Sequence, residues 1–376
     1  MVSILQKEKI HRNLLKWFEK YGRDLPWRKT HDPYAIWVSE IMLQQTQVAT
    51  VIPYYQKFLK SFPTVHHLAR ATLSKVLKIW EGLGYYSRAR NLHQASQMVL
   101  NSFDGKVPDT LKDLLSLPGI GQSTAGAILS FAYNKEAAIL DGNAKRVLSR
   151  LFAVSGNPVR GKTENLLWKI SESLIPKGRS NSFNQALMDL GSMICIPRDP
   201  LCARCPLCHL CKAYLLGKPE SYPLRTLKKI IPHISAISAV IQRDGKVLLN
   251  RRPPKGLLGG LWEFPNWTIE GEKRSRLRLK NHIKKEIGMN VKPTESIGTF
   301  HQTFSHFKLT LHVFHCEDLN RTKGKKEKWI PIQKLHLIPM SRIHRRIAET
   351  IVKPPVRKHG ASSQLRRNPP KHIQLR

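Results

Sequence analysis

Five of the chain's six cysteines lie within seventeen residues, CIPRDPLCARCPLCHLC at 195–211. Their spacing is Cys195-x6-Cys202-x2-Cys205-x5-Cys211, with Cys208 inside the last interval. Thiolates are soft ligands that suit zinc or an iron–sulfur cluster, and four of them complete either site. Structural zinc commonly uses two CxxC pairs about a dozen or more residues apart. This single tight loop therefore favours one [4Fe–4S] cluster over zinc, with Cys208 left free.

A pair of glycines joins two helical patterns in VPDTLKDLLSLPGIGQSTAGAILSFAY, residues 107–133. The first helix is expected to run to Leu117, and the second to begin near Gln122. Gly119 and Gly121 would let the backbone approach a phosphate closely, and the free amides at the second helix's N-terminus would attract it. This pattern predicts a grip on the DNA backbone that is independent of sequence. A tight helical hairpin without a ligand is the alternative.

An aspartate follows at the start of the next helical pattern, DGNAKRVLSRLF at 141–152. Asp141 is a good N-cap residue, and a purely structural cap would explain it. The helix dipole also favours the charged form of a carboxylate in this position. We therefore expect Asp141 to be ionised.

The elements that must position these residues fall into two domains. Residues 1–216 have apolar positions at three- and four-residue spacings, which predicts an all-α domain that includes the cysteine loop. Residues 217–232 read as a linker. Residues 233–346 predict an α+β domain with a hairpin at Asp244-Gly245 and a helix closed by Gly288. The basic stretch 347–376 is expected to be a disordered tail.

The charge of the chain points to a polyanionic partner. Sixty-three Lys and Arg against 26 Asp and Glu give a formal net charge of +37. Double-stranded DNA is the first partner to expect, although a solvated basic surface is the alternative. We see no apolar run long enough to cross a membrane and no signal peptide, so we expect a cytoplasmic, nucleoid-associated monomer.

Taken together, these motifs resemble those of the helix–hairpin–helix DNA glycosylases that carry a [4Fe–4S] loop. The hairpin LPGIGQSTA, the segment LDGNAKRVLSR and the cysteine loop occur in the family's order and at its distances. At the position where the endonuclease III type carries a Schiff-base lysine, this chain has Ser123. Glu40 and the motif Phe304-Ser305-His306 are similar to features of the MutY-type adenine glycosylases. The resemblance therefore implies the MutY type, which removes adenine mispaired with 8-oxoguanine.

The resemblance also implies roles for individual residues. Glu40 lies among apolar neighbours that should raise its pKa, so we expect it to be the acid, while Asp141 stabilises the oxocarbenium ion and Asn143 supports it. The adenine pocket and the base-flipping apparatus are expected to use Trp27, Arg28, Gln45, Tyr85 and Gln185. The expected DNA-binding residues are Gly119, Gly121, Ser123 and Arg88, with Arg90 as a further phosphate contact. Phe304, Ser305 and His306 are expected to read 8-oxoguanine.

The second domain resembles a Nudix fold, but its expected metal-binding helix holds Glu286 alone among lysines. We therefore expect a reader of the opposite base, without pyrophosphatase activity. Three alternatives stay open: an endonuclease III-type pyrimidine glycosylase/lyase, a non-catalytic redox-responsive DNA-binding protein, and a Nudix hydrolase with a DNA-binding arm.

Overall fold

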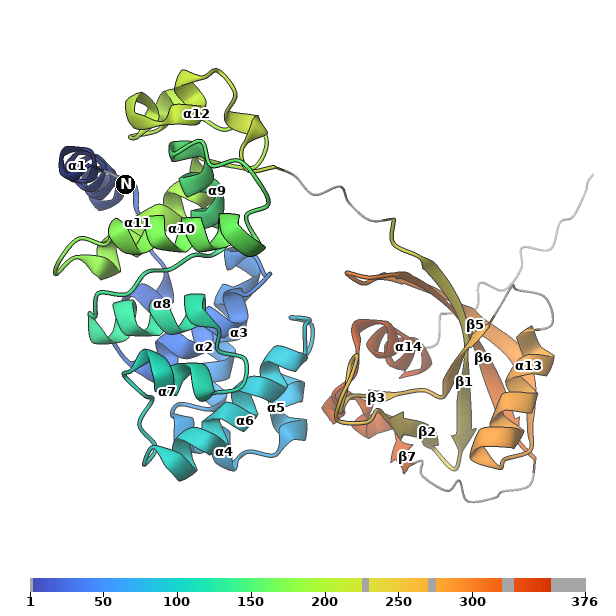
Figure 1. Cartoon of the computed structure of the whole chain (residues 1–376). Coiled ribbons are helices and arrows are strands. Elements are labelled where there is room, and N and C mark those ends of the chain that lie inside the picture. Colours follow the sequence, from blue (N-terminus) through green and yellow to red (C-terminus); the bar gives the residue numbers. More distant parts are fainter. Residues whose placement is uncertain (1–2, 225–229, 270–274, 320–327, 353–376) are drawn as a thin grey trace, which may run out of the picture.

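The computed structural model describes residues 3–224, 230–269, 275–319 and 328–352. A helical domain is followed by a domain built on a sheet, as the sequence predicted (Figure 1). The helices of the first domain are α1 (Ile4–Tyr21), α2 (Pro33–Leu43), α3 (Val48–Ser61), α4 (Val65–Arg70), α5 (Leu73–Ile79), α6 (Ser87–Ser102), α7 (Leu111–Ser116), α8 (Gln122–Tyr133), α9 (Gly142–Leu151), α10 (Gly161–Ser173), α11 (Ser180–Met193) and α12 (Lys212–Leu215). Short 3-10 turns lie at η1 (Pro26–Arg28), η2 (Cys202–Arg204), η3 (Cys208–Leu210) and η4 (Pro219–Ser221).

Side-chain caps fix where several of these helices begin. The side chains of Asp32, Thr72 and Thr110 accept hydrogen bonds from free amides at the starts of α2, α5 and α7. Asp141 caps α9 by accepting a hydrogen bond from the amide of Ala144. The expected start of α9 at Asp141 is therefore confirmed.

The helical domain has two large buried cores. One core is built from η1 and helices α2 to α8, and Trp37, Phe58 and Trp80 are buried in it. The other joins α1 to α9, α10 and α11, so the start of the chain packs against segments that follow it by more than a hundred residues. Each core holds its helices together by burying apolar surface, and a smaller apolar cluster that includes Ile36 and Phe131 lies beside them.

The second domain is a twisted sheet with helices on both faces. Its strands are β1 (His233–Arg243), β2 (Lys246–Arg251), β3 (Trp262–Glu263), β4 (Asn266–Ile269), β5 (Val291–Thr303), β6 (Lys308–Asp318) and β7 (Lys328–Pro331). The main path is β3-β2-β1-β6-β5, with β4 on β1 and β7 on β2. One face packs against α14 (Arg342–Val352), which follows η6 (Ile332–Leu337). The other packs against α13 (Ser275–His282) and its π-helical continuation η5 (Ile283–Ile287).

The turns of this domain follow the predicted chemistry. Asp244 and Gly245 both have positive φ, and they connect β1 to β2 as a two-residue hairpin. Gly288, in the left-handed region, ends the α13 and η5 helical segment. Both predictions are confirmed.

The predicted end of the second domain was placed too early. We expected the tail to begin at residue 347, but α14 continues to Val352, and Ile347 and Ala348 are buried against the sheet. A helix whose apolar stripe packs in the core continues until that stripe ends. The many basic residues of this segment hid the apolar stripe from the sequence analysis. The rest of the predicted tail lies outside the described residues.

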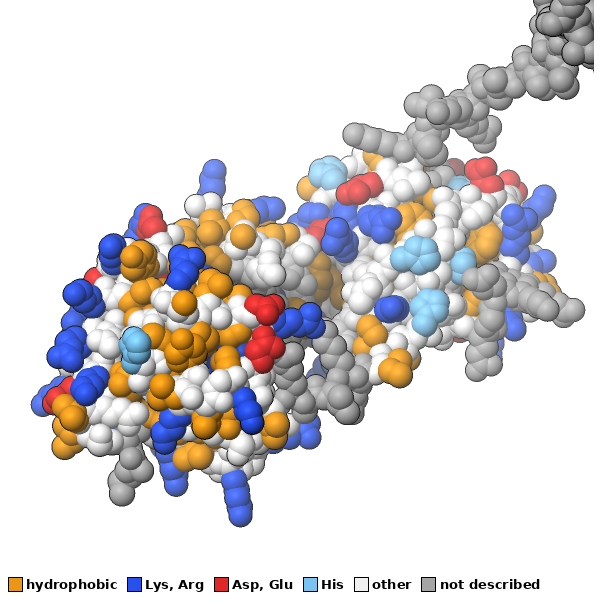
Figure 2. All heavy atoms as spheres, turned by 90° about the horizontal axis from the view of Figure 1, so that it is seen from above, with side chains coloured by type: hydrophobic (Ala, Val, Ile, Leu, Met, Phe, Trp, Pro, Cys, Tyr) orange, Lys and Arg blue, Asp and Glu red, His pale blue; other side chains and the backbone are white. Residues whose placement is uncertain are grey.

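Basic side chains dominate the surface charge. Figure 2 shows Lys and Arg spread over the visible face of both domains, with Asp and Glu in small groups. In the part of the chain that the structure describes, no helix combines the length and apolar character needed to cross a membrane.

Candidate active site and DNA interface

A pocket opens where the two cores of the helical domain meet. Its walls come from η1 and α2 on one side and from the start of α9 and α11 on the other. The predicted residues Trp27, Arg28, Glu40, Asp141, Asn143 and Gln185 all line it. Sequence positions more than a hundred residues apart therefore meet in one cavity.

Two carboxyl groups face this pocket in different surroundings. Burial, followed by the nearby charge of Asp141, raises the pKa of Glu40 to about 8 from its ordinary 4.5, against the opposing charge of Arg28. Glu40 therefore holds a proton at neutral pH, as its apolar neighbours predicted. Burial also raises the pKa of Asp141, and the hydrogen bonds from Ala144 and Asn143 oppose that rise.

The surroundings of Asp141 oppose its ionisation more than the sequence indicated. We expected the helix start to favour the carboxylate, but desolvation outweighs the cap and moves the pKa of Asp141 upward. Sequence reasoning missed this because burial of the α9 start depends on α11, which packs across it. The pKa values of both carboxyl groups are shifted upward, and the nearby charge of Asp141 favours the protonated form of Glu40.

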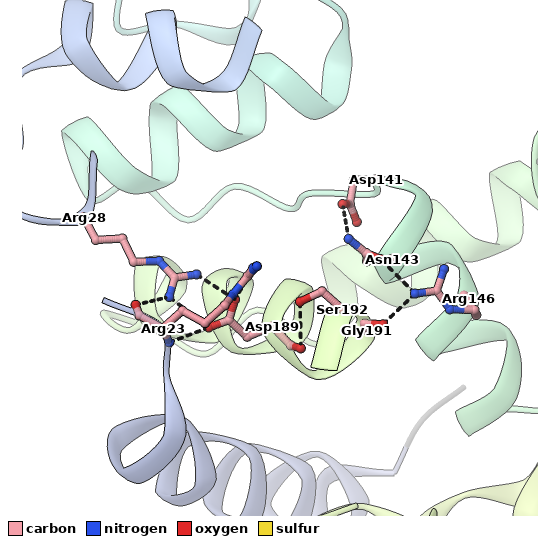
Figure 3. Close-up of polar contacts among 8 residues, drawn as sticks. All are labelled: Arg23, Arg28, Asp141, Asn143, Arg146, Asp189, Gly191 and Ser192. Carbon is pink, nitrogen blue, oxygen red and sulfur yellow. Dashed lines mark hydrogen bonds and ion pairs between the residues drawn. The ribbon is translucent and has the colours of Figure 1, made fainter. Parts of the chain in front are cut away.

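A chain of hydrogen bonds fixes the amide beside Asp141 (Figure 3). Asn143 donates through Nδ2 to Asp141 Oδ2 at 3.2 Å, and its Oδ1 accepts from Arg146 at 2.8 Å. Arg146 also donates to the carbonyl oxygens of Gly191, at 2.6 Å, and Cys195, at 2.7 Å. The predicted support of Asp141 by Asn143 thus exists as a contact, and it is anchored to the first residue of the cysteine loop.

The other wall of the pocket rests on a buried carboxylate that sequence reasoning missed (Figure 3). The Asp189 side chain is fully buried on α11, and it binds Arg28 through two 2.9 Å contacts and Arg23 through its side chain and its backbone amide. Burial works to raise the pKa of Asp189, but these hydrogen bonds prevail and lower it. The guanidinium of Arg28 is thereby held at the pocket wall. The signal available was a lone acid among apolar residues in QALMDLGSM.

The glycine hairpin has the predicted geometry. Gly119 has a φ of +84°, and a Cβ there would lie 2.9 Å from the Cβ of Asn91. Gly121 caps α8, is exposed, and has no protein atom within 4 Å of where a Cβ would lie. Half-buried Ser123 accepts a hydrogen bond from the amide of Leu140 at 3.1 Å. Gly119 therefore forms the turn, while Gly121 leaves open space in front of the helix amides.

The prediction that Arg88 binds a DNA phosphate is wrong. Arg88 is 7% exposed, and its guanidinium donates to the carbonyl oxygens of Ile41, Met42 and Gln44 at the end of α2. Arg90 likewise donates to two carbonyl oxygens of the second domain. A cationic side chain near a glycine turn can donate hydrogen bonds to carbonyl groups as well as to phosphates. The Arg88 side chain is buried, so its guanidinium binds carbonyl groups of the protein.

The residues expected to act on the DNA stack are exposed. Tyr85 has 44% of its surface exposed and a φ of +47°, and Gln45 lies exposed on a turn with a φ of +56°. The Tyr85 hydroxyl lies 2.9 Å from the Oγ of Ser305. Ser305 and His306 form the exposed tip of the β5–β6 turn. A hydrogen bond from the amide of Phe304 to the carbonyl oxygen of Phe307 closes this turn. Tyr85 of the expected base-flipping apparatus therefore contacts Ser305, one of the residues expected to read 8-oxoguanine.

The cysteines of the loop 195–211 surround one small cavity. Cys195, Cys202, Cys205, Cys208 and Cys211 all line it, so position alone does not set Cys208 apart. Burial, with a smaller contribution from the neighbouring thiolates, raises the pKa of Cys205 to about 12. Several thiolates in one cavity need a cationic group to ionise together, so this donor set fits a thiolate-bound cluster. Among the described residues, no group of three or more His, Cys, Asp or Glu has the geometry for one metal ion.

Comparison with known proteins agrees with this geometry. Residues 38–173 match the model of the HhH-GPD superfamily of base excision DNA repair proteins, and residues 236–350 match the NUDIX domain. The adenine DNA glycosylase of Buchnera aphidicola subsp. Baizongia pistaciae is 41% identical over 305 residues, which cover 81% of this chain and 84% of the relative. The chain belongs to the adenine DNA glycosylase family. The family member of Rattus norvegicus is 36% identical and covers 81% of this chain and 69% of its own length.

Solved structures share the helical half of this family member. A thermostable thymine-DNA glycosylase is 33% identical, with a TM-score of 0.52, and covers 56% of this chain and 98% of its own. A trapped endonuclease III–DNA covalent intermediate has a TM-score of 0.50 at 23% identity, which shows a common fold. The predicted two-domain fold class is thereby confirmed.

Proposed function

We propose that this chain is a monofunctional DNA glycosylase that flips adenine out of an adenine:8-oxoguanine or adenine:guanine mispair and hydrolyses its N-glycosidic bond. The observation that carries the proposal is the pair of carboxyl groups in one pocket, of which Glu40 has a pKa of about 8. The adenine glycosylase relatives support the choice of base. Its proposed place of action is with the nucleoid, in the cytoplasm.

Adenine leaves readily only when it is protonated. Glu40 can donate that proton because burial keeps it protonated at neutral pH. Cleavage leaves positive charge on the sugar, and the carboxylate of Asp141 can stabilise that charge, with Asn143 holding its orientation. Trp27, Arg28 and Gln185 line the same pocket and would contact the flipped base. The deprotonated Glu40 can then accept a proton from the attacking water.

The remaining contacts would hold the duplex around the lesion. The amides beside Gly121 can bind a phosphate, and exposed Arg198 and Arg204 of the cysteine loop can bind others. Tyr85 and Gln45 would enter the gap left by the adenine. Phe304, Ser305 and His306 would meet the opposite base, where the Ser305 hydroxyl can hydrogen-bond a purine edge.

Two variants test the chemistry. We expect Glu40→Gln and Asp141→Asn each to lower adenine release by at least about a hundredfold, because each removes one member of the acid and charge-stabilising pair. DNA binding should persist in both. Unchanged adenine release would reject this mechanism and favour a non-catalytic DNA-binding protein.

The rival glycosylase/lyase makes a separate prediction. A lyase needs an amine that forms a Schiff base with the sugar, and Ser123 has none. Borohydride should therefore trap no protein–DNA crosslink on a damaged-pyrimidine duplex. A stable crosslink would overturn the monofunctional assignment.

We also propose that Cys195, Cys202, Cys205 and Cys211 hold one [4Fe–4S] cluster that shapes the loop. The shared cavity and the mutual repulsion of the thiolates support this. Cys208→Ser should keep the brown colour and the iron content of the purified protein, whereas Cys205→Ser should lose them. Equal loss in both variants would contradict the choice of ligands.

A further inference from the structure

The two domains touch through contacts that lie away from the pocket and from the linker. They involve the α5–α6 region of the helical domain, which faces α14 and β3 of the second domain in Figure 1. We call this set the interdomain clasp: Glu81, Tyr86 and Arg90 on one side, and residues 256–261, Met340 and Arg345 on the other. Its members include polar groups that hydrogen-bond between the domains, and Leu261, which is buried in the core of the helical domain.

Arg90 binds the loop 256–261. Its guanidinium donates to the carbonyl oxygens of Gly259 at 3.0 Å and Gly256 at 3.2 Å. Burial lowers the pKa of Arg90, whose side chain is partly buried in these contacts. A charged donor shared by two backbone acceptors forms strong, directional hydrogen bonds.

The same loop enters the helical core. Leu261 is 1% exposed and belongs to the core built by α2 to α8, and Leu258 packs against that core. Gly260 has a φ of +80°, and a Cβ there would lie 3.2 Å from Leu77 Cδ1. The backbone therefore approaches α5 more closely than other residues would allow.

A second set of contacts lies beside it. Arg345 of α14 binds both carboxylate oxygens of Glu81, at 2.6 and 3.2 Å, and these side chains are 17% and 12% exposed. Tyr86 donates its hydroxyl to the carbonyl of Met340 at 3.3 Å. Tyr85, whose hydroxyl contacts Ser305, lies between Glu81 and Tyr86 in the sequence.

We propose that the interdomain clasp holds the reader turn 304–306 against Tyr85 before DNA arrives, so that the opposite-base preference depends on the clasp and not on the linker 217–232. This proposal rests on the proposed function in one respect: the preference concerned is that for adenine opposite 8-oxoguanine over adenine opposite guanine. Glu81, Arg90 and Arg345 are positioning residues in this account, since none lines the adenine pocket.

Cutting the linker in the folded, full-length protein tests the clasp. A specific protease site inserted between residues 224 and 230 allows a single cut. After the cut, the two halves should elute together in gel filtration at micromolar concentration and keep the preference for adenine opposite 8-oxoguanine over guanine. Halves that separate while both stay folded by circular dichroism would overturn the proposal.

Matched variants identify the contacts. In the cut protein, Arg90→Ala and Glu81→Gln should each weaken the association of the halves by about tenfold or more, because each removes charged hydrogen bonds across the seam. Arg70→Ala removes an exposed arginine of the same domain and should leave association unchanged. If Arg90→Ala fails to fold, Glu81→Gln, which keeps the side-chain shape, still decides. Association as tight as in the parent would reject these contacts.

The outcomes separate the clasp from the proposed function. Halves that fall apart, in a protein whose uncut form releases adenine, would refute the clasp alone. An uncut protein that releases no adenine would refute the proposed function, and elution of the halves would still test the clasp.

Discussion

Glu40 carries the raised pKa of the pocket, and its burial should also lower the free energy of unfolding at alkaline pH. Its pKa is about 8 in the folded chain and 4.5 ordinarily. No hydrogen-bond partner for its side chain is found among the described residues. The unfolded chain therefore releases this proton at a lower pH than the folded chain does, and the folded state loses stability between those two values as pH rises.

This sign gives a prediction for Glu40→Gln. The neutral amide avoids the cost of a buried charge, so the variant should be more stable than the parent near pH 8, by up to a few kcal/mol at about 1.4 kcal/mol per pH unit. The difference should vanish as pH falls towards 4.5, the ordinary pKa. Urea unfolding at several pH values measures it. Equal stability of the two proteins at pH 8 would mean that Glu40 is well solvated.

At the scale of elements, the two glycines of the hairpin have different roles. Gly119 adopts a conformation that only glycine takes easily, with Asn91 pressed against it, whereas Gly121 faces open space. Gly119→Ala should lower the free energy of unfolding by about 1–3 kcal/mol. Gly121→Ala should cost about 1 kcal/mol or less but weaken DNA binding, because its methyl group occupies the space of a phosphate.

Thermal unfolding and DNA titration of the two variants check this. If Gly121→Ala bound DNA as tightly as the parent, the phosphate would lie elsewhere.

Local sequence signals predicted the elements better than the packing between them. The bounds of α7 and α8, the cap at Asp141 and the turn at Gly245 follow from residues next to one another in the chain. The burial of Arg88 against the end of α2, and the contact of Arg28 with Asp189, depend on segments 40 or more residues apart. Neither contact leaves a local pattern. The glutamate of the pocket was found through a resemblance to whole motifs, and the same resemblance gave the aspartate its expected role.

At the scale of the molecule, contacts between the two domains bring the domain with the proposed catalytic pocket and the domain with the proposed reader turn together. The +37 charge is expected to give affinity for any duplex, so we expect discrimination to come from the pocket and the turn. The clasp and the contact of Tyr85 with Ser305 join the helical domain to the second domain. Substrate choice is thus expected to be a property of both domains together.

The most direct test is adenine release from two duplexes that differ only in the base opposite the adenine. With 8-oxoguanine or guanine opposite, the protein should release free adenine and leave the strand intact until alkali is added, with the faster release opposite 8-oxoguanine. Failure to release adenine from either duplex, together with excision of a damaged pyrimidine, would contradict the account.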